Sequence, residues 1–261
     1  MIDGVMHIYA TIETETIGQG TPVWLFHSLL ADAGSCLPLA AALAARHRVF
    51  VANLPGFGGS APAGPGLEPV ADRMAEAIRA AGAPSAIVAN GYGSFVALML
   101  AVRHPDCVSR LVLAGTGAAF DEPGRMAFRG MGAAAGVKGL EAIADVAMRR
   151  LFSPAFQSAN PGLMAERRAR FVATDPAVFT AACDALSALD IRDAVACLHV
   201  PTLVMVGEGD EATPPRMARE LAALVPGARL VELPGLAHVP QLQDTAAFVA
   251  ALNGFLDPSS G

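Results

Sequence analysis

The chain has 261 residues, of which 53% are hydrophobic and 16% charged, and its formal net charge is -6 at pH 7. This length and apolar content suit one substantial folded core and exclude a largely disordered chain. The sequence has no basic stripe or Lys/Arg cluster, which argues against nucleic acid or an anionic membrane surface as a partner and favours a small, weakly polar ligand.

The apolar runs are short and are interrupted by Gly, Pro or charge, and the first ten residues contain Asp3 and His7 in place of a basic start and an apolar stretch. We therefore expect a soluble, unexported, cytoplasmic protein. The cysteines lie far apart without metal-ligand spacing, which predicts reduced packing residues and neither a metal nor a cofactor. They are Cys36, Cys107, Cys183 and Cys197.

The predicted elements alternate between strands and helices. Residues 7–16 alternate in polarity, which predicts a half-buried strand forming an antiparallel edge hairpin with the next strand. Later strand-like runs are separated by helix-like segments, and this alternation predicts an α/β fold with a mostly parallel sheet covered on both faces. These runs are 22–27, 48–53, 86–89, 111–114, 202–206 and 229–232.

The stretch 117–197 has no strand signal and shows helical spacing in 139–151, 162–173 and 177–189. It predicts a helical cap inserted into a core formed by 1–116 and 198–261. Ligands of open α/β sheets bind outside the carboxyl ends of the strands, so such a cap would enclose an apolar pocket there.

Residues 87–94, with the letters IVANGYGS, have the frame of a hydrolase nucleophile elbow: an apolar strand, a tight turn and an apolar helix. Ala89 and Gly93 are the small flanking residues that let the strand and the helix approach closely. The position of the nucleophile is held by Gly91. Glycine relieves the strained backbone of such a turn and removes the hydroxyl that would form an acyl-enzyme.

Residues 25–29, LFHSL, end a strand where the elbow pattern places a second loop. The backbone N–H groups of Leu29 and Tyr92 are the expected oxyanion donors. Ser28 is expected to contact the substrate or the loop, and His27 to shape the loop by hydrogen bonding.

Asp210 follows the strand-like run 202–206, and His238 lies in a loop after the last run. Together with the elbow they complete the chain order nucleophile, acid, histidine. We expect Asp210 to fix the tautomer of His238, whose other ring nitrogen then acts as a base directed at the elbow.

Two further features are interpreted structurally. Ser94 lies three residues into the helix and is expected to point back along it, away from His238. The glycine-rich residues 54–60, LPGFGGS, lack the P-loop lysine and the dinucleotide-binding spacing, and therefore predict a strand-to-helix turn.

Together these segments resemble the α/β-hydrolase superfamily, and within it the 3-oxoadipate enol-lactonase-like branch, from about Val23 to Leu256. Further marks of the resemblance are GLEAIAD at 139–145, LFSP at 151–154, ALDIRD at 188–193, PTLV at 201–204 and the segment 207–215. The resemblance implies an α/β-hydrolase fold and a cytosolic enzyme that opens a small ester or enol-lactone. Gly91 and Leu151, where that branch has a serine and a tryptophan, depart from its pattern.

Three functions remain open from the sequence. The first is an enzyme in which a His238-Asp210 dyad acts as general base on water or on a substrate proton, with the space at Gly91 admitting that water or substrate. The second is a non-catalytic protein that binds a small molecule in a former hydrolase pocket. The third is a serine hydrolase carrying an introduced Ser-to-Gly change at position 91.

Overall fold

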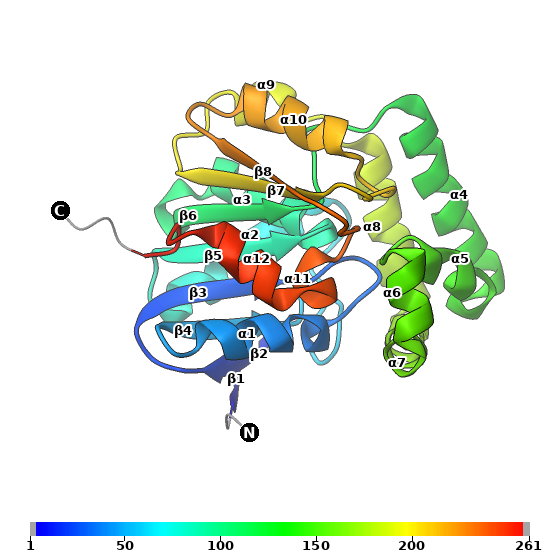
Figure 1. The fold of residues 1–261 in the computed structure, drawn as a ribbon, viewed down its shortest axis with the longest axis horizontal. Coiled ribbons are helices and arrows are strands. Elements are labelled where there is room, and N and C mark those ends of the chain that lie inside the picture. The colour runs from blue at the N-terminus through cyan, green and yellow to red at the C-terminus, as the bar shows by residue number, and fades with distance from the viewer. Residues whose placement is uncertain (1–3, 258–261) are drawn as a thin grey trace.

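The computed structural model describes residues 4–257 and has one eight-stranded sheet with the order β1-β2-β4-β3-β5-β6-β7-β8. Strands β3 to β8 pair in parallel, and β1 and β2 are antiparallel at one edge (Figure 1). This arrangement confirms the predicted mostly parallel sheet. The strands are β1 (Val5–Tyr9), β2 (Ile12–Ile17), β3 (Thr21–Phe26), β4 (His47–Ala52), β5 (Ser85–Asn90), β6 (Val108–Ala114), β7 (Thr202–Gly207) and β8 (Arg229–Leu233).

The edge hairpin differs from the prediction for residues 7–16. That segment contains the turn of the hairpin, at Ala10 and Thr11, which both have positive φ, and contributes to both β1 and β2. β2 then pairs antiparallel with β4. Alternation of polarity across a two-residue turn resembles that of one longer strand, which is why the pattern did not reveal the turn.

Helices cover both faces of the sheet, as predicted. One face carries α1 (Leu37–Leu43), α11 (Pro240–Gln243) and α12 (Thr245–Leu252), and the other carries α2 (Leu67–Ala81), α3 (Tyr92–Arg103), α9 (Arg192–Val195) and α10 (Pro215–Leu224). In β3, Val23 and Leu25 pack into the first layer, whereas Trp24 and Phe26 pack into the second. A strand buried on both faces needs apolar residues throughout, and the sequence of β3 supplies them.

Most of the helical region predicted for 117–197 lies beyond one end of the sheet (Figure 1), whereas its last helix, α9, packs beside α3 and α10 on a face of the sheet. The part beyond the sheet comprises α4 (Glu122–Lys138), α5 (Ala144–Arg149), α6 (Pro154–Ala159), α7 (Pro161–Val172) and α8 (Pro176–Ala188), with a 3₁₀ turn at Leu140–Ile143. The sequence did not predict α4, which contains four glycines that weaken helix propensity. Packing explains one of them: a Cβ added to Gly132 would lie 3.1 Å from Cys183 Cβ of α8, so α4 and α8 approach closely.

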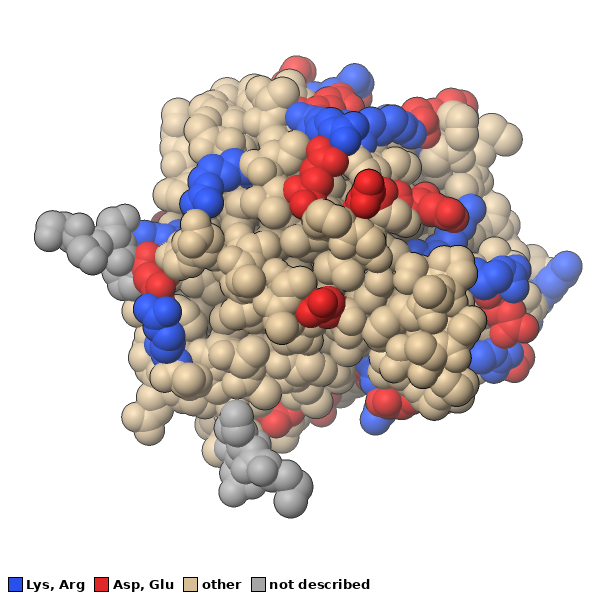
Figure 2. All heavy atoms as spheres, viewed as in Figure 1, with Lys and Arg blue, Asp and Glu red and all other residues tan. Residues whose placement is uncertain are grey.

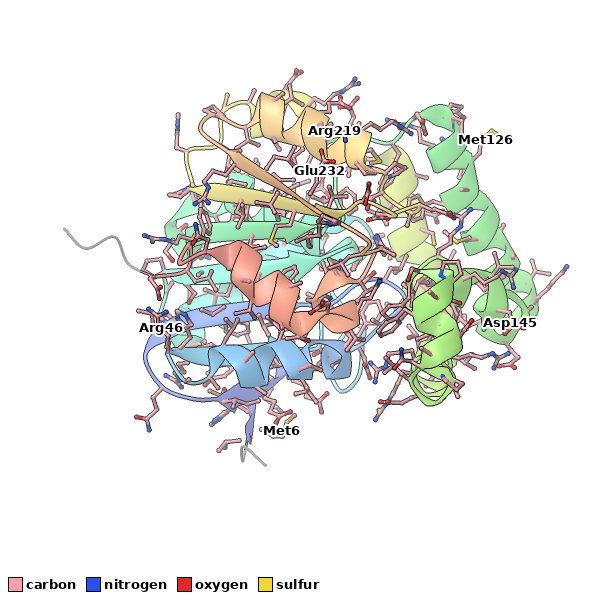
Figure 3. All side chains as sticks on the ribbon, in the orientation of Figure 1. Met6, Arg46, Met126, Asp145, Arg219 and Glu232 are labelled. Atoms are coloured by element: carbon pink, nitrogen blue, oxygen red, sulfur yellow. The ribbon has the colours of Figure 1, made fainter. Side chains whose placement is uncertain are left out.

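Acidic and basic side chains lie next to one another on the face shown in Figure 2, chiefly around α10 and along the outer edge of the cap. Arg219 of α10 and Glu232 of β8 point toward each other (Figure 3), with a shortest N–O distance of 2.7 Å. Within residues 4–257, no helix combines the length and the apolar character needed to cross a membrane.

The order of the strands places a crevice between β3 and β5. From β3 the chain passes to β4 on one side and then to β5 on the other, so the direction of winding reverses at this point. Loops that leave the carboxyl ends of two such strands diverge and leave room for a ligand. Ser28 follows β3 and Gly91 follows β5, so both lie at this crevice.

Candidate functional site

The elbow predicted around Gly91 has the expected backbone. β5 ends at Asn90, α3 begins at Tyr92, and Gly91 between them has φ +53° and ψ -122°. Residues that carry a side chain rarely adopt a positive φ of this kind, whereas glycine adopts it without strain, so glycine suits this position. The Gly91 N–H donates to the Ala114 carbonyl of β6 (2.9 Å), and the Gly93 N–H donates to the His27 carbonyl (3.0 Å). The turn is therefore tied to both neighbouring strand ends.

Ser28 and His238 occupy the space where a side chain at position 91 would be. A Cβ added to Gly91 would lie 2.5 Å from Ser28 Oγ and 2.9 Å from His238 Nε2. The pairing of β3 with β5 explains the place of Ser28: Phe26 is opposite Ala89, so two residues later Ser28 comes opposite Gly91. The Ser28 hydroxyl therefore takes up part of the space that was expected to admit water or a substrate at Gly91.

His238 and Asp210 form a buried pair, as expected from their order in the chain. His238 Nδ1 lies 2.9 Å from Asp210 Oδ2 and 3.1 Å from Oδ1, and the two side chains are 8% and 0% exposed. An ionised carboxylate only accepts hydrogen bonds, so Nδ1 carries the proton and donates it. In the neutral ring Nε2 then has a free lone pair, and it faces Ser28 Oγ at 3.5 Å.

The environment of Asp210 favours its ionised form. Burial alone would raise the pKa of this carboxyl, but the attraction and hydrogen bond of His238, with hydrogen bonds from Thr213, lower the pKa below its ordinary value. Asp210 Oδ1 accepts from the N–H groups of Ala212 and Thr213 (both 2.9 Å), and Oδ2 accepts from the Thr213 hydroxyl (2.8 Å). An ionised Asp210 keeps the proton of His238 on Nδ1.

The two residues whose N–H groups were expected to form an oxyanion site, Leu29 and Tyr92, both line the cavity between the core and the cap. Among residues 4–257, neither the Leu29 N–H nor the Tyr92 N–H has an acceptor. His27 Nε2 accepts from the Leu54 N–H (3.1 Å), so its Nδ1 carries the proton and donates to the Ser28 carbonyl (2.9 Å). Because C=O and N–H of a trans peptide point in opposite directions, this bond turns the Leu29 N–H away from His27. His27 therefore shapes the loop as expected.

Three contacts that the sequence did not predict hold the His238 loop in place. Asn90 Nδ2 donates to the His238 carbonyl (2.8 Å), and the Val239 N–H donates to the carbonyl of Leu151 in the cap (3.1 Å). Gly115, at the end of β6, leaves room for the pair, since an added Cβ would lie 3.0 Å from His238 Nδ1 and 3.1 Å from Asp210 Oδ2. The loop thus rests on both the core and the cap.

Thr213 is another residue of this site that was not singled out. It follows Asp210 by three positions, and aspartate side chains commonly accept hydrogen bonds from backbone N–H groups just after them in the chain, so this spacing was a usable signal. Asn90 and Gly115 gave no such signal, because their contacts depend on how β5 and β6 meet the distant His238 loop.

The Ser94 hydroxyl is directed away from His238, as expected. It is fully buried and donates to the Ala114 carbonyl at 2.9 Å. This hydroxyl is therefore engaged in holding α3 against β6.

A cavity of about 270 Å³ opens on these groups from the cap side. Ser28, Leu29, Gly91, Tyr92 and His238 form its floor. Most of its remaining walls are apolar, with charged side chains at Asp121, Arg150, Glu211 and Arg216. The apolar walls include Phe95, Phe120, Phe128, Met131, Leu186 and Met217. Among the described residues, no group of three or more His, Cys, Asp or Glu side chains is placed to hold a metal ion.

The fold and these strand-end loops are those of one protein family. Residues 21–245 match the family model described as alpha/beta hydrolase fold, and the chain belongs to this family.

Comparison with individual proteins gives similarities that are more specific than the family match. The chain is 31% identical over 249 residues to a pimeloyl-[acyl-carrier protein] methyl ester esterase of Chromobacterium violaceum, covering 93% of this chain and 97% of the relative. It is 30% identical over 251 residues to the putative carbamate hydrolase RutD of Azorhizobium caulinodans, covering 94% and 95%. Among solved structures, the enol-lactonase from Burkholderia xenovorans LB400 has a TM-score of 0.88 at 28% identity, covering 97% of this chain and all of that one (100%).

Proposed function

We propose that this protein hydrolyses a small ester, lactone or related carbonyl compound with His238 as general base, oriented by Asp210, and without a serine at the elbow. The observation that carries the proposal is the buried His238–Asp210 pair, whose free Nε2 faces the cavity floor beside Gly91. Esters, lactones and carbamates, the compounds in the relatives' names, share a carbonyl carbon that a hydroxyl group or water can attack. Leu29 and Tyr92 would stabilise the oxyanion that forms.

The cavity supports a substrate of modest size. Its apolar walls favour an uncharged acyl or alkyl group next to the reacting carbonyl, because that surface is buried on binding. The charged residues among its lining would contact a polar end of the substrate. Leu151, buried in the cap beside the His238 loop, stands where the enol-lactonase-like branch has a tryptophan, so we do not restrict the substrate to an enol-lactone.

The test is release of acid from a panel of small enol-lactones and aryl esters by the unaltered protein and by His238→Ala. General-base catalysis contributes about 10²- to 10⁴-fold, so kcat/KM should fall by that order in the variant. His199→Ala is the matched control, since His199 is exposed and lies on a connector before β7. Turnover that is equal in His238→Ala and the unaltered protein would end this proposal.

The second candidate, a binding protein without catalysis, rests on the absence of an elbow serine above an intact pocket. Tight stoichiometric binding of a panel compound without product formation would favour it, and steady turnover would exclude it.

A further inference from the structure

We propose that Ser28 is the nucleophile of this site, so that the hydroxyl missing from the loop after β5 is supplied by the loop after β3. This inference rests on the proposed function, because it needs His238 as the base that activates the hydroxyl. It differs from direct attack by water in predicting a covalent acyl group on Ser28 Oγ.

The position of the Ser28 hydroxyl is the first support. Its Oγ lies 2.5 Å from where a Cβ of residue 91 would be, within the volume that an elbow side chain would fill. It is also 3.5 Å from His238 Nε2, the ring nitrogen with the free lone pair. This is longer than a formed hydrogen bond between a nucleophile and its base, but such contacts shorten when substrate is bound.

The place of His238 agrees with a nucleophile on the Ser28 side. Its Nε2 would be only 2.9 Å from a Cβ at position 91, which is too close for a serine side chain to fit between them. The His238 imidazole is therefore better placed to deprotonate a hydroxyl on a neighbouring loop than one on residue 91. The Ser94 hydroxyl, donated to the Ala114 carbonyl, is not directed at it.

The two expected oxyanion donors could serve a nucleophile on the loop after β5 or one on the loop after β3. In the elbow arrangement one donor is the N–H of the residue after the nucleophile, and the other comes from the loop after β3. With Ser28 as the nucleophile, Leu29 becomes the residue that follows it and Tyr92 becomes the donor from the other loop. Both N–H groups lack an acceptor among the described residues, and His27 fixes the peptide between Ser28 and Leu29.

Burial protects this hydroxyl from competing partners. Ser28 is 2% exposed and lines the cavity floor, so its hydroxyl can contact the carbonyl of a bound substrate but has little contact with bulk water. Its own carbonyl is held by His27 Nδ1 and the Ala31 N–H (3.2 Å), so the backbone that carries the hydroxyl is fixed from both sides. A fixed nucleophile avoids part of the entropy cost of reaching the attack geometry.

The reaction balances without a further reactant. Ser28 Oγ forms a bond to the substrate carbonyl carbon while its proton passes to His238 Nε2. The ester C–O bond then breaks, and that proton goes to the departing alkoxide. Water adds to the acyl group and gives a proton to Nε2, and the acid leaves as Ser28 Oγ takes the proton back.

The experiment uses a fluorophosphonate probe with the unaltered protein. Ser28 Oγ should displace fluoride from phosphorus, giving a single adduct that peptide mass spectrometry maps to Ser28. The adduct should be absent in Ser28→Ala and form about a hundredfold more slowly in His238→Ala. Ser94→Ala, which removes a buried hydroxyl from the same region, should be labelled like the unaltered protein.

Ester turnover measured alongside separates the two proposals. Loss of turnover in both Ser28→Ala and His238→Ala, together with a burst of leaving group equal to the protein concentration, would support the nucleophile. Full turnover in Ser28→Ala with loss in His238→Ala would overturn it and leave the general-base function standing. Turnover unaffected by either change, or an adduct at another residue, would also overturn it, and the first of these results would remove the proposed function as well.

Discussion

At the scale of single residues, the distances around Gly91 predict the cost of any side chain there. We expect Gly91→Ala to lower the free energy of unfolding by about 1–3 kcal/mol, because the new Cβ meets Ser28 Oγ and His238 Nε2 in a backbone conformation that side chains rarely adopt. Ser28→Gly should remove part of that cost. The coupling in the double variant should be about 1 kcal/mol, measured by urea unfolding.

The matched control for this double-mutant cycle of Gly91 and Ser28 is Gly227→Ala. Gly227 also has a positive φ (+71°), but an added Cβ there would meet nothing within 4 Å. Its substitution should report the backbone strain alone, and its cost should not depend on Ser28. Equal dependence of both alanine variants on Ser28 would contradict crowding at Gly91.

The buried His27 predicts how stability depends on pH. Burial lowers the pKa of His27 from its ordinary 6.5 to about 4. Between these values the unfolded chain binds a proton that the folded protein does not, so acid favours unfolding. The free energy of unfolding should therefore fall by about 3 kcal/mol from this group as the pH decreases from 7 to 4.

Urea unfolding of the unaltered protein and of His27→Gln across this pH range measures that effect. The variant is expected to be less stable at pH 7, since it loses the bonds to Ser28 and Leu54, but to have a flatter profile between pH 6.5 and 4. Parallel profiles would show that other groups cause the pH dependence.

At the scale of elements, Arg167 and Arg170 of cap helix α7 both form ion pairs with Asp32 in the loop after β3. Arg167 Nη1 lies 3.1 Å from Asp32 Oδ1, and the Arg167 side chain is only 5% exposed. Arg167→Met removes the buried partner of Asp32, which keeps only the longer contact to Arg170 (3.7 Å), so the change should cost about 2 kcal/mol in the free energy of unfolding. Arg168→Met on the same helix should cost much less, because Arg168 pairs with exposed carboxylates of Glu141 and Asp145. Urea unfolding compares the two variants, and equal losses would contradict a stabilising role of this contact.

The sequence predicted most elements of the core but fewer of the cap. The central strands are apolar throughout and are bounded by turns, so their positions were evident to within a few residues. The glycine-containing α4 was missed because its stability comes from packing on α8, which local propensity does not describe.

The same limit applies to the site. His238 and Asp210 were found from their order along the chain, and the structure places them in contact. The approach of Ser28 to Gly91 was not predicted, because it depends on the register of β3 against β5, which no pattern in either strand specifies.

At the scale of the whole molecule, cap and core share one apolar cluster. Cys183 of the cap and Cys107 of the core belong to it, and Cys36 belongs to the layer on the opposite face of the sheet. We therefore expect cap and core to unfold together as one cooperative unit.

Thiol labelling with a disulfide reagent tests this expectation. The exposed Cys197 should react in the native protein at pH 8. Burial raises the pKa of Cys36 and Cys183 to about 12 and also raises that of Cys107, so these thiols should stay unreactive. With increasing urea all three should become reactive at one midpoint, with Cys197→Ser removing the background signal. Earlier reaction of Cys183 alone would show that the cap opens independently.

The hydrogen bond from the Val239 N–H to the Leu151 carbonyl links the cap to the chain segment that carries His238. Any movement that lifts this part of the cap must break the bond or pull the neighbouring imidazole out of line with the cavity floor. The position of the base at the cavity floor therefore depends on the cap as well as on the core, so a change in the cap near Leu151 would alter how a bound compound meets the imidazole.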